Sequence, residues 1–394
     1  MDNQYDSLNN EVKEALQNSD QALAVAKIQE YLDEQNNIPL NIAITGESGS
    51  GKSTFVNAFR GVDDSDEGAA PTGCVETTME VTPYPHPNYP NVTLWDLPGM
   101  GTDKFPADKY LEHVGFEKFD FFIIISASRF KENDTKLAQE IQKMGKKFYF
   151  VRSKIDNDLR AERRKKGFNE EKTLTEIREN CFEGLHGDSP QVFLMSSFDL
   201  KLYDFSLLHE TLEKQLPSHK RNALLFAMPN TSLEIINKKK EVFQAQIKYY
   251  ATTSAVGAAV PIPGLSISVD LALLVGALTH YVIGFGLDVK SLQRLADNSQ
   301  VPLKDLIDVI ISPLTAKKIT PDLVMKLLCQ CASIAALMVA EEGSRFIPII
   351  GIPAAIALSF TTTNRALSSF LDMLAEDAHR IFKKALSTQC DTVQ

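Results

Sequence analysis

One stretch of the chain, residues 41–54, constrains the fold more than any other. It reads Asn-Ile-Ala-Ile-Thr-Gly-Glu-Ser-Gly-Ser-Gly-Lys-Ser-Thr. The apolar run over 40–44 predicts a buried strand, and the residues after Lys52 have helical spacing. The glycine-rich segment between them, Gly-x-x-x-x-Gly-Lys-Ser, therefore has the strand–loop–helix context of a phosphate-binding loop. A chance glycine-rich turn before a surface helix is the alternative interpretation.

Each residue type in this loop has a separate role in phosphate binding. The glycines allow backbone N–H groups to surround a β-phosphate, and the helix N-terminus adds a favourable dipole. The Lys52 ammonium can reach the β- and γ-phosphates, and the Ser53 hydroxyl can ligate Mg²⁺. We therefore expect nucleotide contacts from the whole loop: Gly46, Glu47, Ser48, Gly49, Ser50, Gly51, Lys52, Ser53 and Thr54.

The segment 71–80 carries hydroxyl groups that could sense a γ-phosphate. It reads Pro-Thr-Gly-Cys-Val-Glu-Thr-Thr-Met-Glu and follows an acidic loop without periodicity. Nucleotide switches place their γ-phosphate sensor in such a loop, between the first helix and the second strand. Thr72 and Thr78 are candidates to complete the Mg²⁺ shell, and Thr78 is also a candidate catalytic group. The alternative is an ordinary strand, which threonine favours.

A second metal-binding element is predicted at the end of a short strand. Residues 92–96 are followed by Leu-Pro-Gly, so that Asp96 and Gly99 form an Asp-x-x-Gly pattern. Asp96 can hold a Mg²⁺-bound water, and Gly99 allows its backbone N–H to approach a γ-phosphate. The same spacing occurs in ordinary turns. Its position after the phosphate loop and behind a strand favours the metal site.

A base-recognition element is predicted at the ends of two later strands. The strand over 148–153 leads into Ser-Lys-Ile-Asp, and the Asp156 carboxylate can accept two hydrogen bonds from N1–H and the exocyclic amine of guanine. Adenine would leave that carboxylate unpaired. Lys154 can lie along the base plane, and the strand over 191–197 ends with Ser196 and Ser197 near the guanine O6. These residues indicate GTP and GDP as substrate and product.

The order of elements predicts an α/β fold with a second, all-helical domain. Strands alternate with helices over residues 38–220, which predicts a mostly parallel sheet covered on both faces. Over 221–394 strand signals largely disappear and long apolar-periodic segments predict helices. Residues 1–37 predict two short helices whose apolar stripe needs another surface to cover it.

Three segments leave alternatives open. The largely apolar stretches 255–286 and 346–360 are either core helices of a bundle or elements that insert into or adhere to a membrane. The charged run over 160–172 is either a solvated helix or loop or a patch that binds anionic lipid.

Composition narrows the class of partners. The formal net charge of −10 and the isoelectric point near 5.3 argue against binding to nucleic acid.

Five cysteines without a regular framework suit reduced thiols in the cytosol. The polar opening of the chain has no secretory signal pattern, and Asp at position 2 excludes N-myristoylation. We expect a cytoplasmic protein.

The chain resembles the interferon-inducible immunity-related GTPases. The matching stretches are dense over residues 38–220 and weaker through the helical region. Besides the motifs above they are Gly68-Ala-Ala-Pro-Thr-Gly73, Pro83-Tyr-Pro-His-Pro87, Trp95-Asp-Leu-Pro-Gly99, Tyr110-Leu, Asp120-Phe-Phe-Ile-Ile-Ile-Ser-Ala127 and Arg129-Phe-Lys. The Gly-Lys-Ser loop is similar to the effector class of that family. The pair Ser196-Ser197 departs from the usual Ser-Asn.

The resemblance implies a Ras-like domain held against a helical domain that is built from both chain ends. It also implies GTP-dependent dimerisation or oligomerisation with itself or with related GTPases. Assembly would take place on vacuolar or other intracellular membranes, in cell-autonomous defence. The expected localisation is therefore cytoplasmic with peripheral association to endomembranes.

The residue after Gly99 bears on the rate of hydrolysis. Ras-like enzymes carry a water-positioning glutamine there, whereas this chain has Met100, whose thioether cannot orient a water. We expect slow hydrolysis by the monomer, with Lys52 and Gly99 in the catalytic set. On assembly, Glu76 or a partner's backbone carbonyl would complete the site. The alternatives are a signalling switch that separate proteins regulate, and a nucleotide-binding scaffold without significant hydrolysis.

Overall fold

The computed structural model of the chain describes residues 37–73, 80–99, 114–183, 191–258, 265–330 and 351–391, with a few isolated positions before residue 37. The chain divides into two compact units. One unit is continuous, Ile38–Thr231, and the other combines Met1–Asn37 with Ser232–Gln394. The boundary predicted from the sequence lies between residues 220 and 221, whereas the structure keeps residues 221–231 with the first unit.

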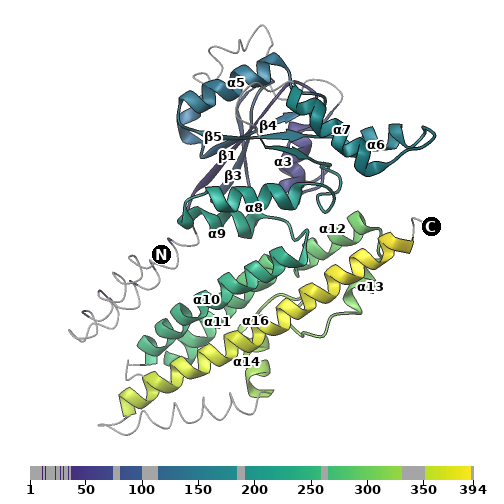
Figure 1. Cartoon of the computed structure of the whole chain (residues 1–394). Helices are drawn as coiled ribbons and strands as arrows, with labels where there is room; N and C mark the ends of the chain where they lie inside the picture. The colour runs from purple at the N-terminus through teal and green to yellow at the C-terminus, as the bar shows by residue number, and fades with distance from the viewer. Residues whose placement is uncertain are drawn as a thin grey trace. The chain divides into compact units, whose positions relative to one another are not determined.

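The first unit is built on a six-stranded sheet in the order β2-β3-β1-β4-β5-β6 (Figure 1). The strands are β1 Leu40–Thr45, β2 Thr82–Pro85, β3 Val92–Asp96, β4 Phe121–Ser126, β5 Lys147–Arg152 and β6 Val192–Leu194. All neighbouring pairs are parallel except β2 and β3. The predicted mostly parallel α/β sheet is therefore confirmed, and the carboxyl ends of β1, β3, β4, β5 and β6 meet at one edge.

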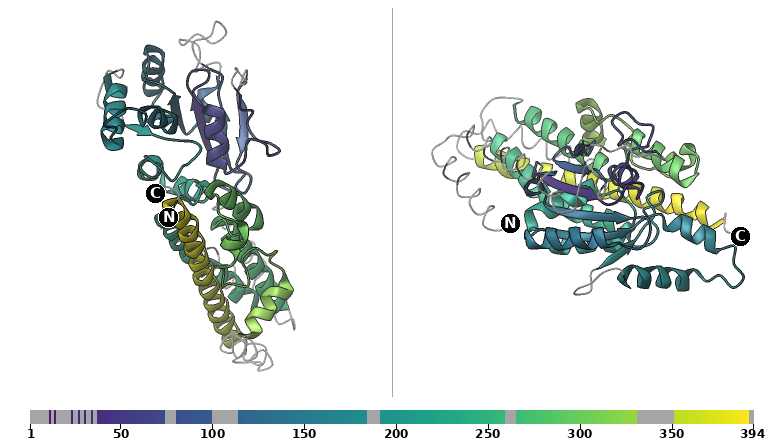
Figure 2. Two further views of the ribbon diagram at one scale, coloured as in Figure 1. Left: turned by 90° about the vertical axis from the view of Figure 1, so that its right-hand side faces the viewer. Right: turned by 90° about the horizontal axis from the view of Figure 1, so that it is seen from above.

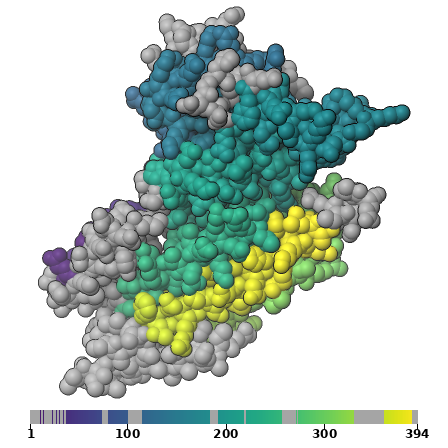
Figure 3. Space-filling model, viewed as in Figure 1, coloured from purple at the N-terminus to yellow at the C-terminus, as the bar shows by residue number. Residues whose placement is uncertain are grey.

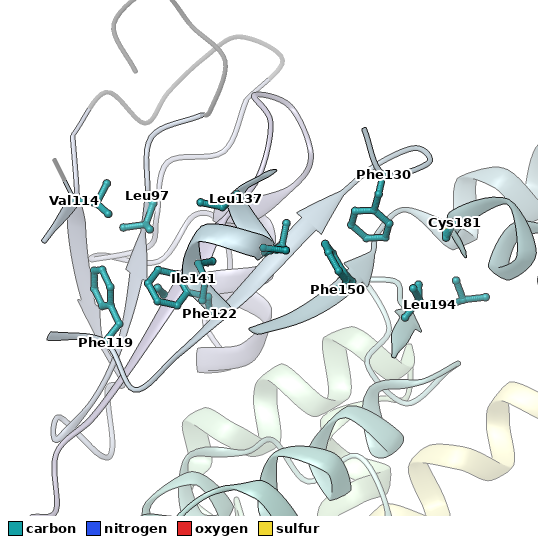
Figure 4. Close-up of a cluster of buried hydrophobic side chains, with 14 of the residues drawn as sticks. Leu97, Val114, Phe119, Phe122, Phe130, Leu137, Ile141, Phe150, Cys181 and Leu194 are labelled. Atoms are coloured by element: carbon teal, nitrogen blue, oxygen red, sulfur yellow. The ribbon is translucent and has the colours of Figure 1, made fainter. Parts of the chain in front are cut away.

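Helices cover both faces of this sheet. They are α3 Lys52–Arg60, α5 Glu132–Lys143, α6 Ile155–Glu162, α7 Glu170–Glu183, α8 Phe205–Gln215 and α9 Ser218–Ala227. On one face, Leu137 and Ile141 of α5 join Phe122 and Phe150 of the central strands in a buried cluster (Figure 4). Elsewhere in the unit, Phe59 of α3 meets Phe205 of α8 edge-on at 6.4 Å between ring centroids. Strand β4 is buried along its whole length, which agrees with its nearly continuous run of large apolar residues.

Strand β2 was not predicted from the sequence. It contains Pro83 and Pro85, and proline cannot donate to a ladder. Strand β2 tolerates these prolines because it lies at the edge of the sheet, antiparallel to β3, where one side of the strand needs no partner. Arg60 of α3 also donates to the Pro85 carbonyl at 3.1 Å and lies 5.3 Å from the centre of the Tyr84 ring.

Within its described residues, the second unit consists of helices joined by turns and loops, without a strand. Its helices are α10 Leu233–Ala258, α11 Leu265–Gly284, α12 Val289–Ser299, α13 Leu303–Ile307, α14 Pro321–Gln330 and α16 Gly351–Asp391. The long helices α10, α11 and α16 pack side by side (Figures 1 and 2). On the face shown in Figure 3, α10 and the yellow α16 lie against each other.

The apolar helices of this unit share a buried interface. Phe243 of α10 packs against Tyr281 and Phe285 of the α11 segment, with centroid distances of 4.7 and 5.5 Å. Within the described residues, the stretch Leu273–Ser299 is long and apolar enough to cross a membrane. However, 44% of its 18-residue apolar segment is buried inside the structure. A core helix of a soluble protein meets the same criteria. Residues 259–264 and 331–350, which include part of both predicted apolar stretches, lie outside the described residues.

Candidate nucleotide-binding site

The phosphate loop has the backbone conformation that only glycine tolerates well. Gly46, Gly49 and Gly51 have φ angles of 139°, 76° and 94°, in the region that other L-residues rarely adopt. A Cβ on Gly46 would lie 2.0 Å from the carbonyl oxygen of Ile125 on β4. Gly46 is therefore required both by its dihedral angle and by the close approach of the neighbouring strand.

Lys52 lies at the start of α3 with its ammonium folded back over the loop. Its Nζ donates to the carbonyl oxygens of Gly46 at 3.2 Å and Glu47 at 3.0 Å, and the side chain is buried. This curled conformation holds a positive charge inside the turn. A phosphate bound by the backbone N–H groups of the loop would be neutralised there.

Ser53 and Asp96 meet at the edge where β1 and β3 end. The Ser53 hydroxyl donates to Asp96 Oδ2 at 2.6 Å, and Asp96 is fully buried. A hydroxyl and a carboxylate at hydrogen-bond distance form the all-oxygen donor set that Mg²⁺ prefers, with phosphates and water supplying the rest. Ser53 and Asp96, two of the three residues predicted as metal ligands, are thus brought together.

Gly99 lies directly against the phosphate loop. A Cβ at this position would be 3.0 Å from the backbone nitrogen of Ser48. That contact is tighter than nearly all real Cβ contacts, so a larger residue would displace one of the two segments. The structure therefore places the Asp-x-x-Gly segment where its backbone can face a phosphate held by the loop.

The base-recognition element is tied to the phosphate loop by hydrogen bonds. Lys154 Nζ donates to the Gly49 carbonyl at 2.8 Å, and the Ser153 hydroxyl donates to the Ser50 carbonyl at 2.6 Å. Asp156 follows at the start of α6. Its Oδ1 atom is inaccessible to solvent and has no hydrogen-bond partner among the described residues. A buried carboxylate oxygen of this kind is costly unless a ligand supplies the donor, and guanine offers two.

The two serines after β6 lie beside this element. Met195 connects them to it, because its carbonyl accepts from Ile155 N at 3.2 Å and its N–H donates to the Arg152 carbonyl at 2.8 Å. Ser196 is buried, and its hydroxyl accepts from the backbone of Phe198 at 3.3 Å. The side chain is thereby used within its own turn, which leaves backbone N–H groups of the segment as the predicted contacts to guanine O6.

The predicted switch residues are only partly described. The Thr72 hydroxyl donates to Asp64 Oδ2 at 3.0 Å, and Asp64 in turn accepts from Asn57 of α3 at 2.8 Å. The structure therefore ties Thr72 to the acidic loop. The other candidates in this group, Glu76 and Thr78, lie outside the described residues, as does Met100.

Three further residues at the site were not predicted from sequence. Lys131, which follows β4, forms an ion pair with Glu47 of the phosphate loop at 2.6 Å. Its backbone N–H donates to the buried Asp134 carboxylate at 3.0 Å, and burial raises the pKa of Asp134 to about 6. Arg152, at the end of β5, is the third. Lys131 belongs to the stretch Arg129-Phe-Lys, which matches the family, so a sequence signal for it exists. No local sequence pattern predicts the contacts of Asp134 or Arg152.

Comparison with known proteins agrees with this geometry. A family model described as Interferon-inducible GTPase (IIGP) matches residues 6–385. The chain belongs to the interferon-inducible GTPase family. It is 44% identical over 386 residues to Interferon-inducible GTPase 5 of Bos taurus, covering 97% of this chain and 83% of that protein.

Two other known proteins are similar to this chain at lower sequence identity. Interferon-gamma-inducible GTPase 10 of Mus musculus is 36% identical over 384 residues, covering 96% of this chain and 89% of that protein. Among solved structures, a GTP-binding protein from Sulfolobus solfataricus in complex with GDP aligns at 22% identity with a TM-score of 0.27. That alignment covers 53% of this chain and 63% of the archaeal one. The family assignment of this interferon-inducible GTPase rests on the family model and the mammalian relatives.

Proposed function

We propose that this chain binds and hydrolyses GTP with Mg²⁺, slowly as a monomer and faster when copies assemble. The observation that carries the proposal is the hydrogen bond of 2.6 Å between Ser53, at the end of the phosphate loop, and Asp96. The same loop accepts a hydrogen bond from Lys154 of the base-recognition element. The residues that we propose to hold metal, phosphate and base therefore lie in one unit of the chain. Membership of the interferon-inducible GTPase family supports the same activity.

Hydrolysis would depend on positioning and on neutralisation of charge. The Lys52 ammonium, which lies inside the loop, would share the negative charge that develops on the β- and γ-phosphate oxygens. Ser53 and Asp96 would hold Mg²⁺, which when bound neutralises phosphate charge. The backbone of Gly99 would face the γ-phosphate from the other side.

The identity of residue 100 supports the proposed dependence on assembly. Methionine replaces the glutamine that orients the attacking water in Ras-like enzymes. The monomer would then lack one positioning group, and a second molecule could supply it through Glu76 or a backbone carbonyl. We extend the proposal to assembly on intracellular membranes in cell-autonomous defence. Membership of an interferon-inducible family supports the defence role, and the apolar helix α11 supports contact with a membrane.

Light scattering combined with turnover measurements tests this proposal. Purified protein is run over a size-exclusion column in GDP, GTP and a non-hydrolysable GTP analogue, and phosphate release is measured on the same samples across protein concentrations. We expect larger species with GTP or its analogue, and turnover per molecule that rises with protein concentration. Lys52→Ala should abolish both, whereas Lys143→Ala, at a 70% exposed side chain on α5, should change neither.

Turnover per molecule that stays flat across concentration, with GTP saturating, would refute activation by assembly and favour a switch regulated by other proteins. The absence of phosphate release at any concentration would favour a scaffold. Flotation of the protein with anionic vesicles in GDP and in the analogue tests the membrane extension separately.

A further inference from the structure

The turn that presents Asp156 is conformationally strained. Lys154, between β5 and α6, has φ 59° and ψ 30°, in the left-handed region that non-glycine residues rarely adopt. A residue held there costs free energy and persists only where its surroundings fix it. Because Asp156 is two residues beyond Lys154, the direction of its carboxylate depends on what fixes this turn.

The Arg152 guanidinium is the group that holds both sides of the turn. Its NH1 donates to the carbonyl of Ser153 at 2.5 Å, just before Lys154. Its NH2 donates to Asp158 Oδ2 at 2.5 Å, two residues after Asp156. One planar group therefore connects the start of the turn to the first turn of α6, with Asp156 lying between the two attachment points.

The burial of this contact makes it a constraint. The Arg152 side chain is only 9% exposed, whereas that of Asp158 is 35% exposed, so the guanidinium end of the pair is buried and the carboxylate end is partly exposed. Charge-assisted hydrogen bonds are short and directional in such surroundings. A lysine could keep the charge but could not hold two acceptors in a fixed geometry, because its ammonium lacks the planar fork.

The same turn is fixed to the phosphate loop on its other side. The Ser153 hydroxyl donates to the Ser50 carbonyl at 2.6 Å, and its N–H donates to the Ser126 carbonyl at 2.9 Å. The Ser153 carbonyl accepts the hydrogen bond from Arg152. Asp156 Oδ1, which has no hydrogen-bond partner among the described residues, lies in the segment that these contacts fix.

We propose that the Arg152–Asp158 pair is a positioning device that sets the guanine selectivity of the site by fixing the turn that carries Asp156. The inference rests on the proposed function and deepens it. Recognition of the exocyclic amine at C2 of guanine requires both carboxylate oxygens of Asp156 in one orientation. Loss of the pair would weaken that recognition more than it weakens the binding of phosphate.

Nucleotides that differ at the base separate these effects. The full chain is titrated calorimetrically with Mg²⁺ and GDP, IDP or ADP, where IDP lacks only the exocyclic amine. The variants are Arg152→Lys, Asp158→Asn and Asp158→Glu. The control is Asp120→Asn, which breaks an ion pair of similar length and burial with Lys220, at the opposite end of the sheet.

For the wild type we expect GDP to bind about tenfold more tightly than IDP, the effect of one hydrogen bond to a charged group. Arg152→Lys and Asp158→Asn should reduce that ratio to about threefold or less, mainly through loss of GDP affinity. Asp158→Glu, which keeps the carboxylate, should recover part of the ratio. Asp120→Asn should leave the ratio unchanged even if it lowers the melting temperature.

An unchanged GDP-to-IDP ratio in folded Asp158→Asn protein would overturn the inference while leaving the proposed function intact. If Arg152→Lys does not fold, the two Asp158 variants decide the question. An equal loss of the ratio in Asp120→Asn would also overturn it, because general destabilisation would then explain the effect. A wild-type chain that binds neither GDP nor GTP would instead refute the proposed function.

Discussion

At the scale of single residues, the phosphate loop distinguishes glycines that differ in their surroundings. Gly46 and Gly49 both have positive φ angles, but a Cβ on Gly46 would meet the Ile125 carbonyl at 2.0 Å, whereas a Cβ on Gly49 would meet nothing within 4 Å. The sequence motif does not distinguish the two glycines. The contact with β4 shows that only Gly46 is also required by the packing of the neighbouring strand.

This difference predicts unequal effects of alanine. Gly46→Ala must move the loop or β4, and we expect loss of GDP binding together with a destabilisation of more than about 3 kcal/mol, in the range of overpacking combined with strain. Gly49→Ala carries only the conformational cost of about 1–2 kcal/mol and should keep measurable binding. Thermal unfolding and calorimetric titration of both variants test this, and equal effects would contradict it.

Lys239 on α10 is a fully buried amine that predicts a pH-dependent stability. Its Nζ donates to the Gly284 carbonyl at 3.1 Å, and burial lowers its pKa from 10.5 to about 7. Between those two values the unfolded chain holds one more proton than the folded chain, so the free energy of unfolding rises with pH.

We therefore expect the melting temperature to increase from pH 7 to pH 9 more steeply in the wild type than in Lys239→Met. The same substitution at the exposed Lys383 of α16 should leave the wild-type slope unchanged. Parallel slopes for wild type and Lys239→Met would show that this amine does not titrate in that range.

At the scale of elements, a buried carboxylate on α16 anchors the loop between α13 and α14. Asp377 is fully buried and accepts from the backbone N–H groups of Ile311 and Ser312, each at 3.0 Å. It also accepts from the Thr315 hydroxyl at 2.8 Å and from Arg380 at 2.6 Å. Three of these four donors belong to the irregular segment between α13 and α14, and they fix that segment to α16.

Removal of this anchor should release the loop. For Asp377→Ala we expect a loss of about 3–5 kcal/mol in the free energy of unfolding of the helical unit, because buried donors are left without acceptors. Hydrogen exchange at the Ile311 and Ser312 amides should accelerate. Asp372→Ala removes a more exposed pair with Lys240 and should cost less than about 1 kcal/mol. Unchanged exchange at both amides would contradict the anchor.

These elements differ in how far the sequence predicts them. Strands β1, β3 and β5 overlap the strands predicted over 40–44, 92–96 and 148–153. Strand β2 was not predicted, because its prolines oppose strand formation and only the free edge beside β3 accommodates them. The anchor at Asp377 joins residues more than 60 positions apart, and no periodicity reveals such a partner.

The site shows the same division. The phosphate loop is a local motif that is recognisable in isolation, whereas the Asp96 and Gly99 pattern and the Ser-Lys-Ile-Asp segment were predicted from their positions at strand ends after that loop. Their mutual contacts were not: the bonds from Ser153 to Ser50 and from Lys131 to Glu47 connect different strand ends. The contacts depend on the order of strands in the sheet, which spacing along the chain does not specify.

At the scale of the whole molecule, the chain combines a nucleotide-binding α/β unit with a helical unit that includes the C-terminal third of the chain. Family membership explains why the two occur in one chain. In the proposed assembly the first unit would bind GTP and pair with another copy, and the second would present apolar helices to a membrane. Both roles require a guanine nucleotide in the loop that begins at Gly46.

Calorimetric titration of the wild-type chain with GDP and Mg²⁺, with ADP and Lys52→Ala protein as comparisons, tests that requirement most directly. The account predicts saturable binding of GDP near one molecule per chain, at least tenfold weaker binding of ADP because Asp156 would be left unpaired, and no binding by the variant. Heat signals that are absent for GDP, or equal for GDP and ADP, would contradict it.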